Sequence, residues 1–338
     1  MNIRMSVLLS LVLVFISSLV FAQKNHVIEF ATIAPGGTPV KIINELNEEI
    51  RKLSDDRIRF RIHAGTQGDE GEIIQKMERF GRIHAAGLTG RGLGEILPAI
   101  RVLELPFLFN NYDEVDYIRD KLYDYFALEF EKKGYVLLGW AEVGFVYMVS
   151  KDRISTRQEL KKAKMWTWSD DPLAEEMFDA LDVDPVSLAL TDALPALQYG
   201  MINAVYAHPY GIIMLQWGDR TNYMNMLPIT YANGAVLIKK KKFDELEPDL
   251  QEILLKSSKK WFDELVKQTR IDNDEAMKIL KEEKGIEFVP KPDGNNLQAF
   301  LDAGISVRNN LVGKLYSQKL LDQVLDYLEE FRKKQIRK

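Results

Sequence analysis

The sequence predicts an α/β protein built as two lobes that one long helix connects. Short apolar runs alternate with longer segments of helical period, which is typical of α/β architecture. The chain has 338 residues, more than a single hydrophobic core usually organises, so two lobes are expected. Residues 244–284 form a polar-rich helical segment, and a helix of that length would extend about 60 Å and reach both lobes. Two shorter helices broken near Lys267 are the alternative.

The composition excludes several classes of protein. Hydrophobic residues make up 46% of the chain and charged residues 28%, which is ordinary for a globular protein and unlike a disordered or collagenous one. Because the chain has no cysteine, thiol nucleophiles, cysteine-bound zinc, iron–sulfur clusters and disulfides are excluded. A formal net charge of −5 offers no general positive field for nucleic acid or for an anionic membrane surface. We therefore expect no nucleic-acid partner.

The first 22 residues have the features of a secretory signal peptide. Arg4 provides a positive start, residues 7–20 form an apolar run broken only by serines, and Ala22 is a small residue before Gln23 at the cleavage position. An uncleaved anchor is the alternative, although the run is short for a membrane span of about 20 residues. Since no cysteine is available for lipid attachment, a lipoprotein is excluded. Removal of 22 of the 338 residues leaves an expected periplasmic protein of 316 residues.

The elements of the first lobe follow from local patterns. Short apolar or alternating runs that end at glycine, proline or polar residues predict strands, and apolar residues three or four apart predict helices. On this basis we expect strands at residues 26–33, 58–63 and 83–86, then a glycine-rich turn, with helices at residues 38–54, 72–80 and 112–133. Residues 135–149 are long enough for two consecutive strand segments, and we expect the chain to cross between the lobes there.

A second α/β unit and a C-terminal helix complete the expected fold. The unit has strands at residues 164–168, 184–188 and 204–208 and helices at residues 172–181 and 191–199, and a strand at residues 232–238 returns to the first lobe. The last element is an amphipathic helix at residues 311–336. The expected domains are lobe I at residues 23–146 and about 232–262, lobe II at residues 147–231 and about 263–310, and a C-terminal helix at residues 311–338.

The sequence contains no pattern of an enzyme or of a metal site. The four histidines, His26, His63, His84 and His208, lie far apart and lack the spacing of metal ligands. Neither a nucleophile elbow nor a Walker sequence occurs. We expect no catalytic residue, no metal and no cofactor.

Three features are candidates for contact with a ligand. Residues 87–94 include four glycines, which would let the backbone approach a ligand or the facing lobe, or would form a flexible loop. His208 ends a predicted strand before Pro209, where side chains often enter a cleft, although a satisfied polar residue at a strand end is equally compatible. Aromatic residues also gather where the lobes should meet, and a cleft between lobes is a common ligand site. They are Trp140, Phe145, Tyr147, Trp166, Trp168, Tyr206, Tyr210, Trp217 and Tyr231.

Several segments, in order, carry a resemblance to a known family. They are Ala31–Pro35 (ATIAP), Gly65–Glu70 (GTQGDE), Leu105–Phe109 (LPFLF), Lys164–Trp168 (KMWTW), Asp184–Pro185, Ala196–Asn203 (ALQYGMIN) and Ala207–Pro209 (AHP). Over about residues 27–290 the chain resembles the periplasmic solute-binding proteins of tripartite ATP-independent periplasmic (TRAP) transporters, of the DctP type. The resemblance implies two α/β lobes around a hinged cleft, a long helix spanning both, and delivery of a small molecule to membrane permease subunits. Some relatives also work with a periplasmic helical-repeat protein, which is a further candidate partner.

The same resemblance shows where the sequence departs from the family. Trp166 stands in place of the arginine that pairs with the carboxylate of the ligand, and Val146 stands where a second arginine falls. His208 replaces an asparagine that precedes the proline matching Pro209, and Leu190 replaces an aromatic residue of the pocket.

From these departures we expect a largely hydrophobic or aromatic ligand. A buried carboxylate without cationic partners carries a desolvation penalty of several kcal/mol. An apolar wall instead stabilises a ligand that buries apolar surface against it. His208 or Glu142 would supply one polar contact. The full set of expected ligand contacts is Trp166, Val146, His208, Leu190, Trp140, Glu142, Trp168, Tyr206, Tyr210, Tyr231, Gly87 and Thr89.

Three alternatives remain from the sequence. The first is a receptor for an organic acid in which another cation, for example Arg91, replaces the missing arginines. The second is an interaction protein whose helix at residues 311–336 docks a periplasmic partner. An enzyme is the third, and nothing in the sequence favours it.

Overall fold

The computed structural model describes residues 25–336. The predicted signal peptide lies outside these residues. Within them, no helix is both long enough and apolar enough to cross a membrane.

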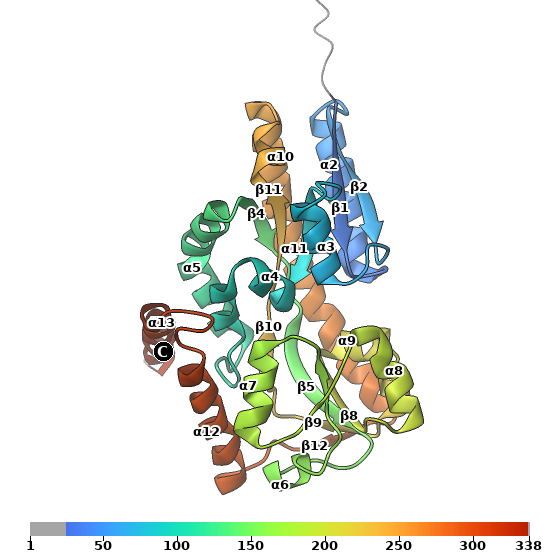
Figure 1. Ribbon diagram of the computed structural model, residues 1–338, viewed down its shortest axis with the longest axis vertical. Coiled ribbons are helices and arrows are strands. Elements are labelled where there is room, and N and C mark those ends of the chain that lie inside the picture. The colour runs from blue at the N-terminus through green and yellow to red at the C-terminus, as the bar shows by residue number, and fades with distance from the viewer. Residues whose placement is uncertain (1–24, 337–338) are drawn as a thin grey trace, which may run out of the picture.

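Two sheets define two lobes (Figure 1). The sheet of lobe I contains β1 (His26–Thr32), β2 (Ile58–Ala64), β3 (Ala85–Thr89), β4 (Tyr135–Trp140) and β11 (Gly234–Lys239), in the order β2-β1-β3-β11-β4. Strand β1 is parallel to both neighbours, whereas β11 is antiparallel to β3 and β4. Its helices are α2 (Gly37–Leu53), α3 (Glu70–Glu78), α4 (Gly90–Ile96), the 3-10 helix η1 (Pro98–Glu104), α5 (Tyr112–Lys132) and α10 (Lys240–Asp244).

The sheet of lobe II has the order β10-β5-β9-β12, with β8 also paired to β5. Its strands are β5 (Gly144–Ser150), β8 (Ala204–Ala207), β9 (Tyr223–Asn225), β10 (Thr230–Ala232) and β12 (Glu287–Val289), and β6 (Trp166–Trp168) and β7 (Val186–Leu188) form a separate parallel pair. The helices around it are α6 (Arg157–Leu160), α7 (Pro172–Leu181), α8 (Leu190–Tyr199), α9 (Pro209–Met214) and η2 (Gly218–Arg220). The chain continues into α12 (Gly294–Asn310), which contacts α7, and α13 (Gln318–Ile336), which contacts α5.

Three connections join the lobes. The chain crosses at residues 141–143, between β4 and β5, and again at Asn233, between β10 and β11. The third connection is α11 (Pro248–Glu282), a helix of 35 residues that contacts α2 of lobe I and α9 of lobe II. Phe262 of α11 packs into the core of lobe I and Leu280 into that of lobe II. The expected fold of two α/β lobes with a shared helix is therefore confirmed.

The expected long helix is continuous through Lys267, which excludes the alternative of a break there. It begins later than expected because Pro248 disfavours helical backbone at the preceding residue. Glu247 accordingly has φ −62° and ψ 151° and caps α11, and the residues before it form the short helix α10.

Other boundaries also differ from the sequence-based expectations. The expected glycine-rich turn at residues 87–94 is the end of β3 followed by α4. The C-terminal helix begins at Gln318 and not at residue 311, because Gly313 takes a left-handed conformation with φ +78° in the turn between α12 and α13. The expected lobe boundary between residues 146 and 147 falls inside β5, and the crossing lies a few residues earlier.

Candidate ligand-binding site

Two adjoining cavities lie between the lobes. The first chamber has a volume of about 210 Å³ and the second chamber about 260 Å³. Both are lined by residues of the two lobes, so together they form an interlobe cleft. The six residues that line both chambers are Ile33, Thr89, Val143, Leu190, His208 and Leu215.

Lobe II supplies an aromatic wall to the first chamber. The Trp166 ring packs 5.2 Å from Tyr206 and 5.3 Å from Trp217, measured between ring centroids, and Trp168 lies 6.2 Å away. Trp166 is only 2% exposed, and its indole Nε1 donates a hydrogen bond of 3.1 Å to the Leu188 carbonyl oxygen. Trp166, which the sequence resemblance places where the family has an arginine, is therefore anchored in the core of lobe II and presents little surface to a ligand.

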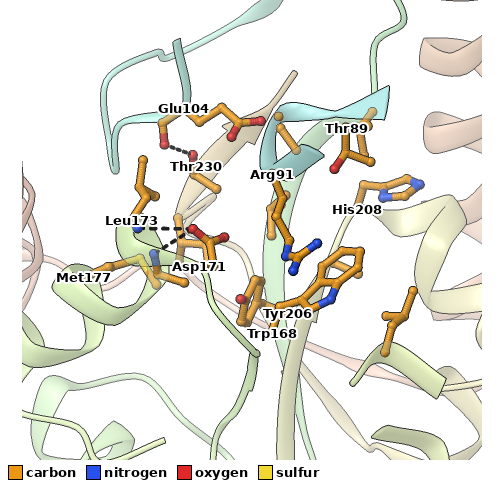
Figure 2. A pocket seen from close by; sticks show the side chains of 18 of the residues that line it. Thr89, Arg91, Glu104, Trp168, Asp171, Leu173, Met177, Tyr206, His208 and Thr230 are labelled. Carbon is orange, nitrogen blue, oxygen red and sulfur yellow. Dashed lines mark hydrogen bonds between the residues drawn. The ribbon is translucent and has the colours of Figure 1, made fainter. Parts of the chain in front are cut away.

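Arg91 brings a positive charge into the same chamber from lobe I. Its Cζ lies 5.2 Å from the centroid of the Trp168 ring, and Figure 2 shows the guanidinium pointing into the chamber beside that ring. Its Nη1 lies 3.3 Å from Glu95 Oε1, and its buried Nε has no hydrogen-bond partner among residues 25–336. Arg91 therefore keeps donor capacity that a bound carboxylate can use.

The second arginine of the first chamber, Arg101, is already neutralised. Its Nε lies 2.8 Å from Glu104 Oε2, and its Nη2 lies 2.9 Å from Asp171 Oδ1. Burial raises the pKa of Glu104 to about 7, against the opposing attraction of Arg101. Since two buried carboxylates share this guanidinium, Arg101 is not free to bind a ligand carboxylate.

Two glycines of α4 make room for buried carboxyl groups. A Cβ atom at Gly90 would lie 2.0 Å from Glu104 Oε1, and one at Gly92 would lie 2.9 Å from the Glu70 carboxyl carbon. The Glu70 carboxylate accepts hydrogen bonds from Thr89 Oγ1 at 2.8 Å and from Gly92 N at 3.0 Å. Burial raises the pKa of Glu70. The glycine-rich segment thus lets these side chains hold α4, and with it Arg91, at the edge of the cleft.

His208 stands where the two chambers meet. It caps the N-terminus of α9, and its ring forms no hydrogen bond to another residue of the described part of the chain. Burial lowers the pKa of His208 to about 4, so its imidazole is uncharged at neutral pH. A neutral imidazole offers one donor and one acceptor to a ligand.

Most of the expected contact residues lie at the cleft. Val146, Trp166, Trp168 and Tyr206 line the first chamber, Gly87, Glu142 and Tyr210 line the second, and Thr89, Leu190 and His208 line both. Trp140 and Tyr231 lie outside both chambers: the Trp140 ring packs under the Arg119 guanidinium, and the Tyr231 hydroxyl bonds to Arg119 and Glu142.

Glu142 was expected to offer a polar contact to the ligand, but its carboxylate is already bonded to other side chains. Its side chain is 0% exposed, and its carboxylate accepts hydrogen bonds from Arg119, Arg270 and Tyr231. The carboxylate is therefore saturated, and the polar contact expected of it is not free for a ligand.

The sequence interpretation missed Arg101, Glu104 and Asp171 as lining residues of the first chamber. Arg101 and Glu104 are charged residues within an otherwise apolar run, and that pattern signals a buried ion pair. Asp171 lies 70 positions from Arg101 along the chain, so only the fold brings the two together.

This geometry is that of a two-lobed solute receptor: a cleft between two α/β lobes that three connections join, with cavities lined from both lobes. The family model of the bacterial extracellular solute-binding proteins, family 7 (DctP), matches residues 30–311, and the chain belongs to this family. The resemblance to TRAP solute-binding proteins is confirmed, and the family is one of receptors and not of enzymes.

Individual relatives are distant in sequence and close in fold. The 2,3-diketo-L-gulonate-binding periplasmic protein YiaO of Escherichia coli is 26% identical over 265 residues, which cover 77% of this chain and 76% of YiaO. A TRAP solute-binding protein from Citrobacter koseri with bound D-glucuronate superposes with a TM-score of 0.79 at 22% identity, over 89% of this chain and 99% of that one. One from Desulfovibrio salexigens with bound orotic acid gives 0.82 at 15% identity, over 90% and 99%.

Proposed function

We propose that this protein is the periplasmic receptor of a TRAP-type transport system for an organic acid with a largely apolar or aromatic body. It captures the acid in the interlobe cleft and delivers it to membrane permease subunits. The observation that carries the proposal is the Arg91 guanidinium, which lines the first chamber against a wall of aromatic rings (Figure 2).

The sequence predicts a ligand that is largely hydrophobic. The proposal keeps this property for most of the molecule and adds a carboxylate group that binds Arg91. Arg91 is the substitute cation considered as an alternative, and a charge-assisted hydrogen bond to it is worth about 1.5–3 kcal/mol. The aromatic wall still favours an apolar body, at about 25 cal/mol for each Å² buried. The ligands named for three relatives, 2,3-diketo-L-gulonate, D-glucuronate and orotic acid, are all organic acids, which supports the carboxylate.

The remaining partner expectations have different support. Delivery to a permease follows the way in which the family works. A periplasmic helical-repeat partner stays a prediction.

The first test of the proposed function is the ligand itself. Native mass spectrometry of the receptor purified from its own cells, without refolding, should release a molecule that carries a carboxylate. A neutral lipid or an organic cation in its place would contradict the proposal.

The second test is the substitution Arg91→Gln. Loss of the charged contact should weaken binding of the released acid by about ten- to a hundredfold in isothermal titration calorimetry. Arg153→Gln is the matched control, because Arg153 is half-exposed and lies outside both chambers. Unchanged affinity in the Arg91 variant, or equal affinity for the acid and its amide, would refute the role of Arg91.

A further inference from the structure

We infer that the second chamber is a subsite for an uncharged, apolar tail of the ligand. The receptor then selects amphipathic acids that are long enough to reach from Arg91, past His208, into this chamber. The inference rests on the proposed function, which supplies the carboxylate contact at Arg91.

The sizes of the chambers favour a ligand that uses both. Ligand sites in proteins usually have volumes of about 300–1,000 Å³. The first chamber, at about 210 Å³, is smaller than this range, and the two chambers joined fall within it. The carboxylate end therefore occupies the smaller, charged chamber, and the rest of the molecule extends into the larger one.

The lining of the second chamber favours an apolar group of the ligand over a second carboxylate. Most of it is aliphatic: Ile33, Ala34, Pro35, Pro39, Ile43, Leu88, Ala141, Val143, Leu190, Met214, Leu215, Val236 and Leu265. Neither lysine nor arginine is among its lining residues in the described part of the chain. A second carboxylate on the ligand would find no cation here.

The two acidic residues of the second chamber are already engaged. The Glu142 carboxylate is bonded to Arg119 and Arg270. Asp272 accepts hydrogen bonds from the Thr38 hydroxyl and from Gln268 Nε2. Arg119 and Arg270 offset the charge of Glu142, whereas Thr38 and Gln268 are neutral donors that do not offset the charge of Asp272. The chamber therefore disfavours a second carboxylate, and its aliphatic lining favours an apolar tail.

The residues that line both chambers are also uncharged. Leu190, Leu215 and His208 line both chambers, and the low pKa of His208 leaves its ring neutral. Gly211 lets the ring lie close to α9, since a Cβ atom there would lie 2.6 Å from the His208 Cε1 atom. A tail can therefore pass this point without desolvating a charged side chain.

The test is a series of straight-chain acids, butanoate, hexanoate, octanoate and decanoate, titrated into the full receptor by calorimetry. Affinity should rise about fourfold for each methylene that enters the second chamber, the increment expected for a buried CH₂ group. If these acids bind with an affinity that does not change with chain length, the inference is overturned.

The substitution Met214→Asp tests whether the increase in affinity with chain length arises in the second chamber. Met214 lines the second chamber and is 46% exposed, so its replacement has little effect on folding. It should weaken the binding of decanoate by more than that of butanoate. The control is Met201→Asp, because Met201 is 57% exposed and lies outside both chambers. Equal losses for butanoate and decanoate in the Met214 variant would show that the chamber is not a separate subsite.

The outcomes separate this inference from the proposed function. If none of the acids binds, the inference fails, whereas the proposed function is decided by the co-purified ligand. If Arg91→Gln has no effect on the acids that bind, the proposed role of Arg91 fails and the inference fails with it. If the acids bind in an Arg91-dependent manner without a chain-length effect, only the inference fails.

Discussion

His208 is the residue at which burial changes the charge state most plainly. A histidine in an unfolded chain titrates near 6.5, whereas burial lowers the pKa of His208 in the folded protein to about 4. Between these two values the unfolded chain binds a proton that the folded protein does not. The contribution of His208 to stability is therefore complete above about pH 6.5 and is lost as the pH falls towards 4.

The substitution His208→Gln should reduce this acid sensitivity. The free energy of unfolding of the wild type, minus that of the variant, should fall between pH 7 and pH 4.5 by at most about 3 kcal/mol. Urea unfolding followed by circular dichroism at both pH values measures this difference. A difference that does not depend on pH would show that His208 titrates normally.

For single residues, the sequence predicts which side chains are aromatic and buried better than it predicts whether they line the cavity. Trp166, Trp168 and Tyr206 belong to one aromatic cluster at the first chamber, as expected. Trp140 and Tyr231 are aromatic residues that were expected in the same cluster, yet their side chains contact Arg119 outside both chambers. Aromatic density in a sequence does not separate a cavity wall from a core, because both bury rings against apolar neighbours.

At the scale of elements, the Arg101–Asp171 ion pair joins the two lobes. Arg101 lies on η1, which packs against α4 of lobe I, and Asp171 caps α7 of lobe II. Asp171 Oδ1 also accepts hydrogen bonds from Leu173 N and Ala174 N at the start of α7. The pair is buried, so opening of the cleft must expose or separate it.

The substitution Asp171→Asn isolates the charge of this pair from the cap, since asparagine caps a helix as well as aspartate does. Loss of the charge should favour the open state, which an increase in the radius of gyration of the ligand-free variant in small-angle X-ray scattering measures. Asp179→Asn, at an exposed position on the same helix, is the control. Equal radii of gyration of the two variants would exclude a role for the pair in closure.

The elements differ in how far the sequence determines them. The limits of α7, Pro172–Leu181, match the prediction, because Asp171 caps its start, Pro172 begins it, and Asp182 ends it in a left-handed conformation with φ 61°. The segment at residues 87–94 was predicted as a turn from its glycines. It folds as the end of β3 and as α4 because those glycines accommodate Glu70 and Glu104, whose positions depend on the tertiary structure.

At the scale of the whole molecule, an ionic network holds two of the three connections between the lobes. Glu142 lies in the crossing between β4 and β5, and Arg270 lies on α11. Arg270 Nε donates to Glu142 Oε1 at 2.8 Å, and its Nη1 donates to Asp116 Oδ2 on α5 at 2.8 Å. Arg119 Nη1 adds a contact of 3.0 Å to Glu142 Oε2. The network therefore fixes the crossing segment at residues 141–143 against the long helix.

The substitution Arg270→Gln should loosen this junction. Removing one partner of a buried ion pair usually costs about 3–5 kcal/mol, and the cost here should be nearer 2 kcal/mol because Glu142 keeps Arg119. The Arg270 side chain is also 22% exposed, so water can solvate part of the site. Urea unfolding measures the loss, and the radius of gyration of the ligand-free variant in small-angle X-ray scattering should increase.

Two further variants separate the geometry of the junction from its charge. Arg270→Lys keeps the positive charge but cannot bond to Glu142 and Asp116 at once with a planar fork, so it should lose about half as much stability as Arg270→Gln. Lys267→Gln removes an exposed charge from the same helix and should change neither quantity. If Arg270→Lys behaves as the wild type, charge alone holds the junction. If Arg270→Gln also has the stability and the radius of gyration of the wild type, the network does not hold the lobes. The packing of α11 then holds them, through Phe262 in lobe I and Leu280 in lobe II.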